Sequence, residues 1–191
     1  MTQTYEYFNV ALLVRKYMEQ LLLETKRLIL RPYEFPDADQ VKNLAGDSRV
    51  SDTTLNIPHP YTIDMAREWI STHKIEWKER TGLVYAVTEK GTGQLLGTVS
   101  LIEINESNAE LGYWFGVPYW GNGYCSEAVK ALIEYSFSVL DLSSLYAEHL
   151  ASNPASGRVM VKNGMHYLGC IHKKNREGVL SKIETYEIKH T

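Results

Sequence analysis

The chain has 191 residues, of which 44% are hydrophobic and 23% charged, the balance of a soluble globular protein. Its formal net charge of −3 excludes a broad nucleic-acid-binding surface, which would be basic, and no run approaches the ~20 apolar residues of a membrane span. The two cysteines, Cys125 and Cys170, show no metal-ligand spacing, so we expect no metal site, no nucleic-acid or membrane partner, and a reduced, cytoplasmic compartment.

The chain begins with a segment that we separate from the main domain. Residues 5–22, YEYFNVALLVRKYMEQLL, have the composition of one amphipathic helix. We therefore expect a helical N-terminal extension over residues 1–22 and one domain over residues 23–191, a length that fits a single domain. Three roles stay open for the extension: docking on the domain, a homodimer contact, or partial disorder.

One strand and two helices are predicted next. In residues 27–34, RLILRPYE, Leu28 and Leu30 lie on one face and Ile29 and Arg31 on the other, which is a strand pattern. A short helix is expected from Pro36 to about Leu44. A second helix follows from Thr62, whose side chain can cap its first turn, and Gly82 is expected to end it.

The centre of the chain predicts a sheet with one crossover. Short turns separate three runs with strand character, 83–89, 95–104 and 109–117, which together indicate an antiparallel meander. Residues 126–140 have apolar residues near helical spacing, and residues 144–150 read as a strand. The last meander strand, this helix and this strand form a β-α-β unit, which predicts one parallel strand pair.

A fourth helix, 154–163, and two closing strands, MHYLGCIHKK and KIETYEIK, complete the chain. The predicted order is β-α-α-β-β-β-α-β-α-β-β. No internal repeat or low-complexity linker interrupts it. This order predicts an α+β (mixed α/β) single domain.

Two glycines stand between the last meander strand and the crossover helix, in YWGNGYCSEA, residues 119–128. The first N–H groups of a helix lack intrahelical partners and carry the positive end of the helix dipole. A glycine-rich entry lets an anion approach this backbone closely, as in phosphate sites. The segment is neither a P-loop, since no Gly-Lys-Ser/Thr follows, nor a dinucleotide fingerprint, since Ser126 takes the place of the third glycine.

The longer segment GYWFGVPYWGNGYCSEA, residues 112–128, resembles the acyl-CoA-binding motif of the GNAT superfamily of N-acetyltransferases. It is similar above all to the branch that includes the ribosomal-protein N-terminal (alanine/serine) acetyltransferases. Three further segments resemble that branch in the same order: ETKRLILRPYE at 24–34, LLGTVSL at 95–101, and ASNPASGRVMVKNGM at 151–165. The resemblance covers about residues 23–189.

The resemblance implies a GNAT-like fold, in which a central, mostly antiparallel, twisted sheet holds one splayed parallel strand pair and about four helices flank it. It also implies acetyl-CoA as co-substrate, with the pantetheine in the gap between the splayed strands and the pyrophosphate on the amides of the glycine turn. Asn153 would contact the pantetheine or the thioester from the far wall. The cofactor-binding residues implied are Phe115, Val117, Trp120, Gly121, Asn122, Gly123, Tyr124, Cys125, Ser126, Asn153 and Ser156.

The chain departs from the family pattern at three positions. Trp120 stands where Gln or Arg is usual, and Cys125 stands where Ala or Gly is usual. Many relatives have a tyrosine general acid seven residues after the Asn of Asn-x-x-Ser, but this chain has Met160 there. The tyrosine-based mechanism is therefore not carried over. An acyl-carrying role for Cys125 is disfavoured, because its place in the motif is beside the phosphates.

Acyl transfer from a thioester needs a neutral amine, donors for the oxyanion and, where required, a proton for the thiolate. Glu148 is the first candidate for the base, because some N-terminal acetyltransferases place a glutamate there; Glu110 is the second and Glu103 a weaker third. A purely structural role stays open for each carboxylate. Ser156 is the serine that parts of this branch are proposed to use to protonate the thiolate, with helix capping as the alternative.

We therefore expect an N-acetyltransferase that moves an acetyl group from acetyl-CoA to a primary amine by direct transfer in a ternary complex. The acceptor is expected to be a protein N-terminal α-amine or a small amine, and a homodimer is left open. The alternative is a non-catalytic CoA-binding regulatory module, which the methionine at position 160 favours.

Overall fold

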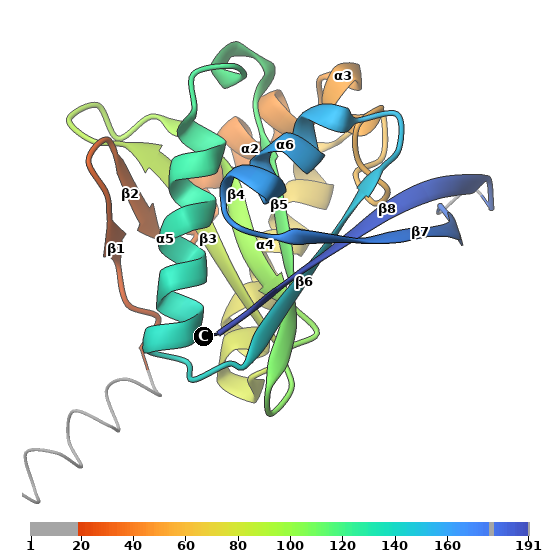
Figure 1. The fold of residues 1–191 in the computed structure, drawn as a ribbon. Helices are drawn as coiled ribbons and strands as arrows, with labels where there is room; N and C mark the ends of the chain where they lie inside the picture. Colours follow the sequence, from red (N-terminus) through yellow and green to blue (C-terminus); the bar gives the residue numbers. More distant parts are fainter. Residues whose placement is uncertain (1–18, 176–177, 191) are drawn as a thin grey trace, which may run out of the picture.

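The computed structural model describes residues 19–175 and 178–190 (Figure 1). Its helices are α2 (Ala38–Ala45), α3 (Ser48–Ser51), α4 (Ile63–Glu79), α5 (Tyr124–Ser138) and α6 (Pro154–Lys162). Its strands are β1 (Leu23–Glu24), β2 (Leu28–Arg31), β3 (Gly82–Glu89), β4 (Leu95–Ile102), β5 (Asn108–Phe115), β6 (Ser144–Leu150), β7 (His166–Lys174) and β8 (Leu180–Lys189). No described helix is long and apolar enough to cross a membrane.

The expected N-terminal extension falls largely outside this range. Residues 1–18 lie outside the described residues, so the helix expected over 5–22 is not tested there. Residues 19–22 are described and form no helix. The chain enters the sheet directly after them, at β1.

All the strands join one sheet in the order β1-β2-β3-β4-β5-β6-β8-β7. Neighbouring strands run antiparallel except β5 and β6, which are parallel. Helix α5 supplies the crossover that a parallel pair requires. The mixed α/β fold with one parallel pair, predicted from the sequence, is confirmed.

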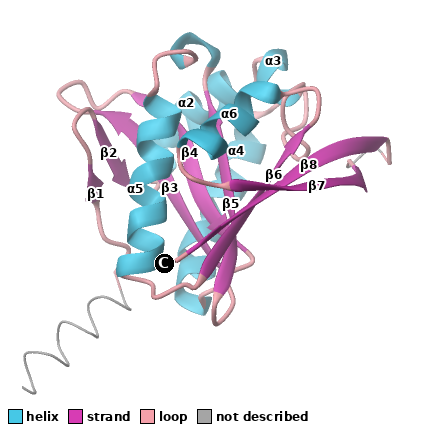
Figure 2. Cartoon of the chain, viewed as in Figure 1, coloured by secondary structure: helices cyan, strands magenta, loops and turns pink. Residues whose placement is uncertain are grey.

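Helices cover both faces of the sheet (Figure 2). Helices α5 and α6 pack on one face and contribute to the larger hydrophobic cluster, while α2 and α4 pack on the other around a smaller cluster. Because both faces are covered, β3 is buried at every position from Gly82 to Thr88. The central strands are therefore a rigid base for the loops at their ends.

Two local features differ from the sequence prediction. The four-residue helix α3 was not expected, because one turn leaves no apolar periodicity; the Asp47 side chain caps it by accepting from the Arg49 N–H. Helix α4 ends at Glu79 rather than at Gly82. Arg80 takes the left-handed conformation there, and its guanidinium lies 4.2 Å from the centre of the Trp77 ring.

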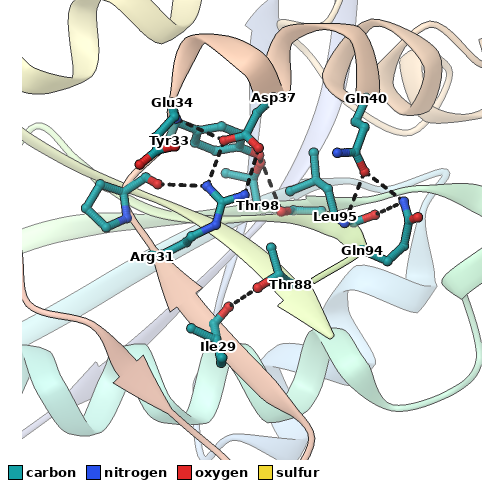
Figure 3. Close-up of polar contacts among 12 residues, drawn as sticks. Ile29, Arg31, Tyr33, Glu34, Asp37, Gln40, Thr88, Gln94, Leu95 and Thr98 are labelled. Atoms are coloured by element: carbon teal, nitrogen blue, oxygen red, sulfur yellow. Dashed lines mark hydrogen bonds and ion pairs between the residues drawn. The ribbon is translucent and has the colours of Figure 1, made fainter. Parts of the chain in front are cut away.

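A polar network fixes the start of α2 to the sheet (Figure 3). Arg31 on β2 donates two hydrogen bonds of 2.7 Å to the buried carboxylate of Asp37, which also accepts from the Glu34 N–H at 2.9 Å. Beside it, the Tyr33 hydroxyl lies 2.7 Å from Thr98 Oγ1 on β4. Charged bidentate bonds of this kind are strong and directional, so the network holds the α2–α4 layer in register with the sheet.

The parallel pair is short and then opens. Strands β5 and β6 pair from Asn108 to Glu110 and from Ser144 to Tyr146. Beyond these residues β5 continues to Phe115 and β6 to Leu150 with no pairing between the two strands. The result is a splayed pair, with unpaired backbone along both inner edges.

Candidate functional site

The glycine turn leads directly into α5. Gly121 and Gly123 have φ values of +76° and +77°, a left-handed conformation that favours glycine. Helix α5 begins at Tyr124, two residues earlier than predicted, and no side chain caps its first amides. The free N–H groups at this end of the helix face the turn, and the helix dipole adds positive potential there. The geometry therefore matches an anion-binding turn.

Arg27 forms contacts that hold this turn in place, a role that was not predicted from the sequence. Its guanidinium donates to the Asn122 carbonyl at 3.0 Å and to Glu127 Oε2 at 2.7 Å, and it lies 4.4 Å from the centre of the Tyr124 ring. Thr25 Oγ1 donates to Glu127 Oε1 at 2.6 Å. Burial acts to raise the pKa of Glu127, but these hydrogen bonds outweigh it and the pKa is lowered. Glu127 is thus an ionised anchor between α5 and the β1–β2 segment.

A cleft of about 1030 Å³ extends from the turn into the gap between β5 and β6 and on to α3 and α4. Such a volume is enough for a cofactor and a second ligand. Ten of the residues predicted for the site line it: Glu110, Phe115, Trp120, Gly121, Gly123, Cys125, Ser126, Glu148, Asn153 and Ser156. Val117, Asn122 and Tyr124 do not line it. The Tyr124 side chain instead donates to Glu89 at 3.1 Å.

Trp120 changes one expected contact. Its indole N–H donates to the Phe115 carbonyl at 2.6 Å, so this carbonyl already has a partner from the protein. The indole ring remains 42% exposed and lines the cleft. Trp120, which departs from the family pattern, therefore occupies the carbonyl of Phe115, one of the residues expected to bind the cofactor.

Two hydroxyl groups meet where α6 begins. Ser156 Oγ donates to the Tyr113 hydroxyl at 2.9 Å, and that hydroxyl donates to the Ser156 carbonyl at 2.9 Å. Burial raises the pKa of Tyr113, so the phenol keeps its proton. Asn153 caps α6 through its side chain and donates to the Thr53 carbonyl at 3.2 Å, which ties α6 to the loop after α3.

Met160 does not reach this cleft. Its side chain is 1% exposed and belongs to the larger hydrophobic cluster. Strand β5 and helix α6 therefore bring the hydroxyls of Tyr113 and Ser156 together. From the sequence, Tyr113 is able to supply a hydroxyl to the site, with a packed aromatic ring as the favoured alternative.

The carboxylates lie at the point where β5 and β6 separate. Glu110 pairs in register with Tyr146, and Glu148 follows two residues later, so all three side chains share one face of the sheet. Burial first, and then the charge of Glu148, raises the pKa of Glu110. Glu148 forms an ion pair of 2.6 Å with Lys173. The structure thus distinguishes a paired carboxylate from one with an increased affinity for a proton.

Glu103, the third candidate base, lies at the edge of this group. It accepts from the Tyr146 hydroxyl at 3.3 Å and does not line the cleft. Burial and the neighbouring carboxylates raise the pKa of Tyr146 to about 12. Cys125 does line the cleft, but burial raises the pKa of its thiol, which keeps it protonated. This opposes a role for Cys125 as a nucleophile.

Two further observations bound the site. Among residues 19–175 and 178–190, no three His, Cys, Asp or Glu side chains gather as a group that could hold a metal ion. A smaller cavity of about 560 Å³ lies against α6 and β8 and includes His149, Gly157 and Tyr186. It contains neither the glycine turn nor Glu110 and Glu148, so the larger cleft is the better candidate for chemistry.

Comparison with known proteins agrees with this geometry. The family model described as an acetyltransferase (GNAT) domain matches residues 27–166. The chain is 29% identical to the uncharacterized N-acetyltransferase YoaA of Bacillus subtilis over 154 residues, which cover 80% of this chain and 86% of YoaA. It is 32% identical to the ribosomal-protein-serine acetyltransferase of Escherichia coli over 80 residues, 41% of this chain and 45% of that protein.

A solved structure gives the corresponding match in three dimensions. The GNAT-family acetyltransferase from Bacillus anthracis superimposes with a TM-score of 0.77 at 26% identity. The superposition covers 88% of this chain and 98% of that one. The described sheet and its flanking helices are therefore those of an acetyltransferase domain.

Proposed function

The chain belongs to the family of GNAT acetyltransferases, which are acetyl-CoA-dependent enzymes, and we propose that it transfers the acetyl group directly to a primary amine held in the same cleft. One observation carries this proposal. A single cleft is lined at one end by the glycine turn of α5 and elsewhere by the carboxylates Glu110 and Glu148. Donor and acceptor can therefore be bound together, as direct transfer in a ternary complex requires.

The cofactor is proposed to follow the splayed edge of β5. Amides of the turn from Gly121 to Ser126 bind its pyrophosphate, supported by the dipole of α5. The pantetheine runs between β5 and β6, where unpaired backbone offers hydrogen bonds, and Asn153 lies on the α6 side. The cations Arg158 and Lys162 line the same cleft from α6, which suits the phosphate-bearing end of the cofactor.

The amine must lose a proton before it attacks. For an α-amino group this costs about 1 kcal/mol at pH 7, against roughly 4–5 kcal/mol for a lysine side chain, so a carboxylate is an adequate acceptor for the former. Glu110 is proposed to take the proton, because its raised pKa increases its affinity for a proton, whereas Glu148 is held in an ion pair with Lys173. The nitrogen then attacks the thioester carbonyl, and the C–S bond breaks as the amide forms. The second proton of the nitrogen leaves to solvent, which balances the proton that the thiolate takes up.

The departing thiolate is proposed to meet the Ser156 hydroxyl. This hydroxyl can turn from Tyr113 toward the sulfur, because the two groups are linked by a single hydrogen bond from Ser156 Oγ. A thiolate is a fair leaving group, so a hydrogen bond from Ser156 and a final proton from water are sufficient. The absent tyrosine at position 160 is then no obstacle to turnover.

Two acceptor classes remain in the proposal. The similarity to the ribosomal-protein-serine acetyltransferase supports a protein N-terminal α-amine. The lining of the cleft supports a cationic small amine as the second candidate, since Glu68 joins the two carboxylates beside the aromatic rings of Trp69 and Trp114.

The test is release of free thiol from acetyl-CoA across a panel of amines: peptides with free N-termini, a polyamine, amino acids and an amine-bearing antibiotic. We expect release with at least one class, an acetylated product, and intersecting initial-rate plots that indicate a ternary complex. Glu110→Gln should slow the reaction, while Glu106→Gln, in the exposed loop before β5, should not. If the folded protein binds CoA but releases no thiol in the presence of any amine of the panel, the proposal is wrong.

A further inference from the structure

Lys173 reaches the candidate active site from a different part of the chain. It belongs to β7, the edge strand of the sheet, whose hairpin with β8 extends beside β6 (Figure 1). Its ammonium lies 2.6 Å from Glu148 Oε2. The Glu148 side chain is only 12% exposed, so the ion pair is largely shielded from water on the glutamate side.

The charges around this pair are unbalanced. Three carboxylates face the region: Glu148 from β6, Glu110 from β5 and Glu103 from the end of β4. The Tyr146 hydroxyl from β6 is neutral near pH 7, because burial and these carboxylates raise its pKa to about 12. In the part of the chain that the structure describes, Lys173 is a cation that interacts with all three carboxylates, whereas Lys182 on β8 is paired with Glu184. One ammonium therefore offsets three acidic groups.

Two carboxylates on one face of a sheet cannot both ionise easily without a counterion, and they then hold one proton between them to higher pH. Burial weakens the charged form of Lys173, but the hydrogen bond to Glu148 and the attraction of the carboxylates outweigh it, so the pKa of Lys173 is raised. The ammonium therefore persists across the neutral range and holds the Glu148 carboxylate in the ion pair.

We propose that Lys173 is a positioning residue that holds the Glu148 carboxylate in an ion pair, leaves Glu110 as the proton acceptor, and so sets the pH at which acetyl transfer begins. This inference rests on the proposed function, in which these carboxylates serve the acceptor amine. Lys173 is not among the residues that line the cleft. It acts through the charge and the orientation of Glu148.

The charges determine the direction in which loss of Lys173 shifts the pH dependence of the rate. Without the ammonium, no cation opposes the effect of the Glu148 charge on Glu110, and the pKa of Glu110 rises. A base whose pKa rises is protonated, and inactive, up to a higher pH. Loss of Lys173 should therefore lower the rate at acidic and neutral pH, and the rate should recover as the pH increases.

The experiment compares kcat/KM between about pH 5 and about pH 9 in wild-type protein, Lys173→Met, Lys173→Arg and the control Lys174→Met. Lys174 is the next residue on β7, is exposed, and points to the opposite face. For Lys173→Met we expect the acidic limb of the kcat/KM profile to move to higher pH by roughly one unit. Lys173→Arg should restore the wild-type profile, and Lys174→Met should match it. Two acceptors whose amines differ in pKa separate this limb from titration of the substrate.

A loss of rate by the same factor at every pH, or an unmoved limb, would overturn the inference while leaving the proposed function intact. Carbon NMR titration of the Glu110 and Glu148 carboxyl groups provides a readout that needs no turnover. Raised carboxyl pKa values in Lys173→Met would support the role of Lys173 even if no acceptor were found. Unchanged values would reject it.

Discussion

The hydroxyl of Ser156 donates to the hydroxyl of Tyr113 at 2.9 Å, and Tyr113 donates back to the Ser156 carbonyl at the same distance. The two side chains come from β5 and α6. The phenol thereby holds the first turn of α6 and positions the oxygen of Ser156, whose hydroxyl hydrogen is proposed to turn toward the thiolate.

Tyr113→Phe should consequently reduce kcat. Removing the phenolic oxygen leaves the serine hydroxyl without its acceptor, a loss of about 1–1.5 kcal/mol and so of roughly tenfold in rate. The KM for acetyl-CoA should change less, because the pyrophosphate contacts are elsewhere. Steady-state kinetics of Tyr113→Phe, Ser156→Ala and the double variant measure the coupling. A double variant no slower than Ser156→Ala agrees with positioning, whereas fully additive losses would show that the two residues act independently.

Gly123→Ala should weaken the cofactor site. Gly123 has a φ of +77°, where a side chain costs about 1–2 kcal/mol, so the turn would shift and the KM for acetyl-CoA should rise about tenfold. Gly91→Ala is the matched control, since Gly91 has a φ of +87° in the β3–β4 turn with open space around it. That variant should lose stability without a change in KM. If Gly123→Ala and Gly91→Ala change the KM for acetyl-CoA equally, the glycine turn has no specific role in cofactor binding.

His73 should make the fold sensitive to acid. It is 6% exposed, neither ring nitrogen has a hydrogen-bond partner among the described residues, and burial lowers its pKa from 6.5 to about 4. Since the unfolded chain binds the proton more readily, this contribution to stability is complete above pH 6.5 and is lost as the pH falls toward 4.

Between pH 7 and pH 5 the loss from His73 should be on the order of 2 kcal/mol of unfolding free energy. Urea unfolding at both pH values measures it. His73→Phe should reduce the difference by about that amount, whereas His166→Gln, at an exposed position, should leave the difference as in the wild type. An unchanged difference in His73→Phe would assign the acid sensitivity to other groups.

Asp37→Asn should destabilise the fold and spare the chemistry. The substitution removes the negative partner of Arg31 in a buried bidentate pair, which costs about 3 kcal/mol when one ion is left uncompensated. Urea unfolding should show this loss, and the KM for acetyl-CoA should stay near the wild-type value because neither Asp37 nor Arg31 lines the cleft. Asp39→Asn, at an exposed position on α2, should fall within about 0.5 kcal/mol of wild type.

Much of the fold follows from local pattern. The strand predicted over 144–150 has the bounds of β6, because its apolar and polar residues alternate without a break. The parallel pairing of β5 and β6 followed from the helix between them. The two-residue strand β1 and the one-turn helix α3 were missed, since neither is long enough to show a period.

The residues of the site likewise divide into those predicted from local sequence motifs and those that were not predicted. The glycine turn and the candidates Glu110, Glu148, Asn153 and Ser156 come from continuous motifs, and each of these residues lines the cleft. The partners of those residues were not predictable. Tyr113 lies 43 positions from Ser156, Lys173 lies 25 from Glu148, and Arg27 lies 100 from Glu127. Such contacts arise only when the sheet order brings distant segments together.

One cleft between β5 and β6 is proposed to hold the cofactor and to direct its thioester toward Ser156 and Glu110. A crystal structure of the protein with bound CoA tests it most directly. We expect the pyrophosphate on the amides between Gly121 and Ser126, the pantetheine in the gap between β5 and β6, and the sulfur beside Ser156 Oγ. Pyrophosphate bound away from the turn, or CoA in the smaller cavity against α6 and β8, would contradict the account.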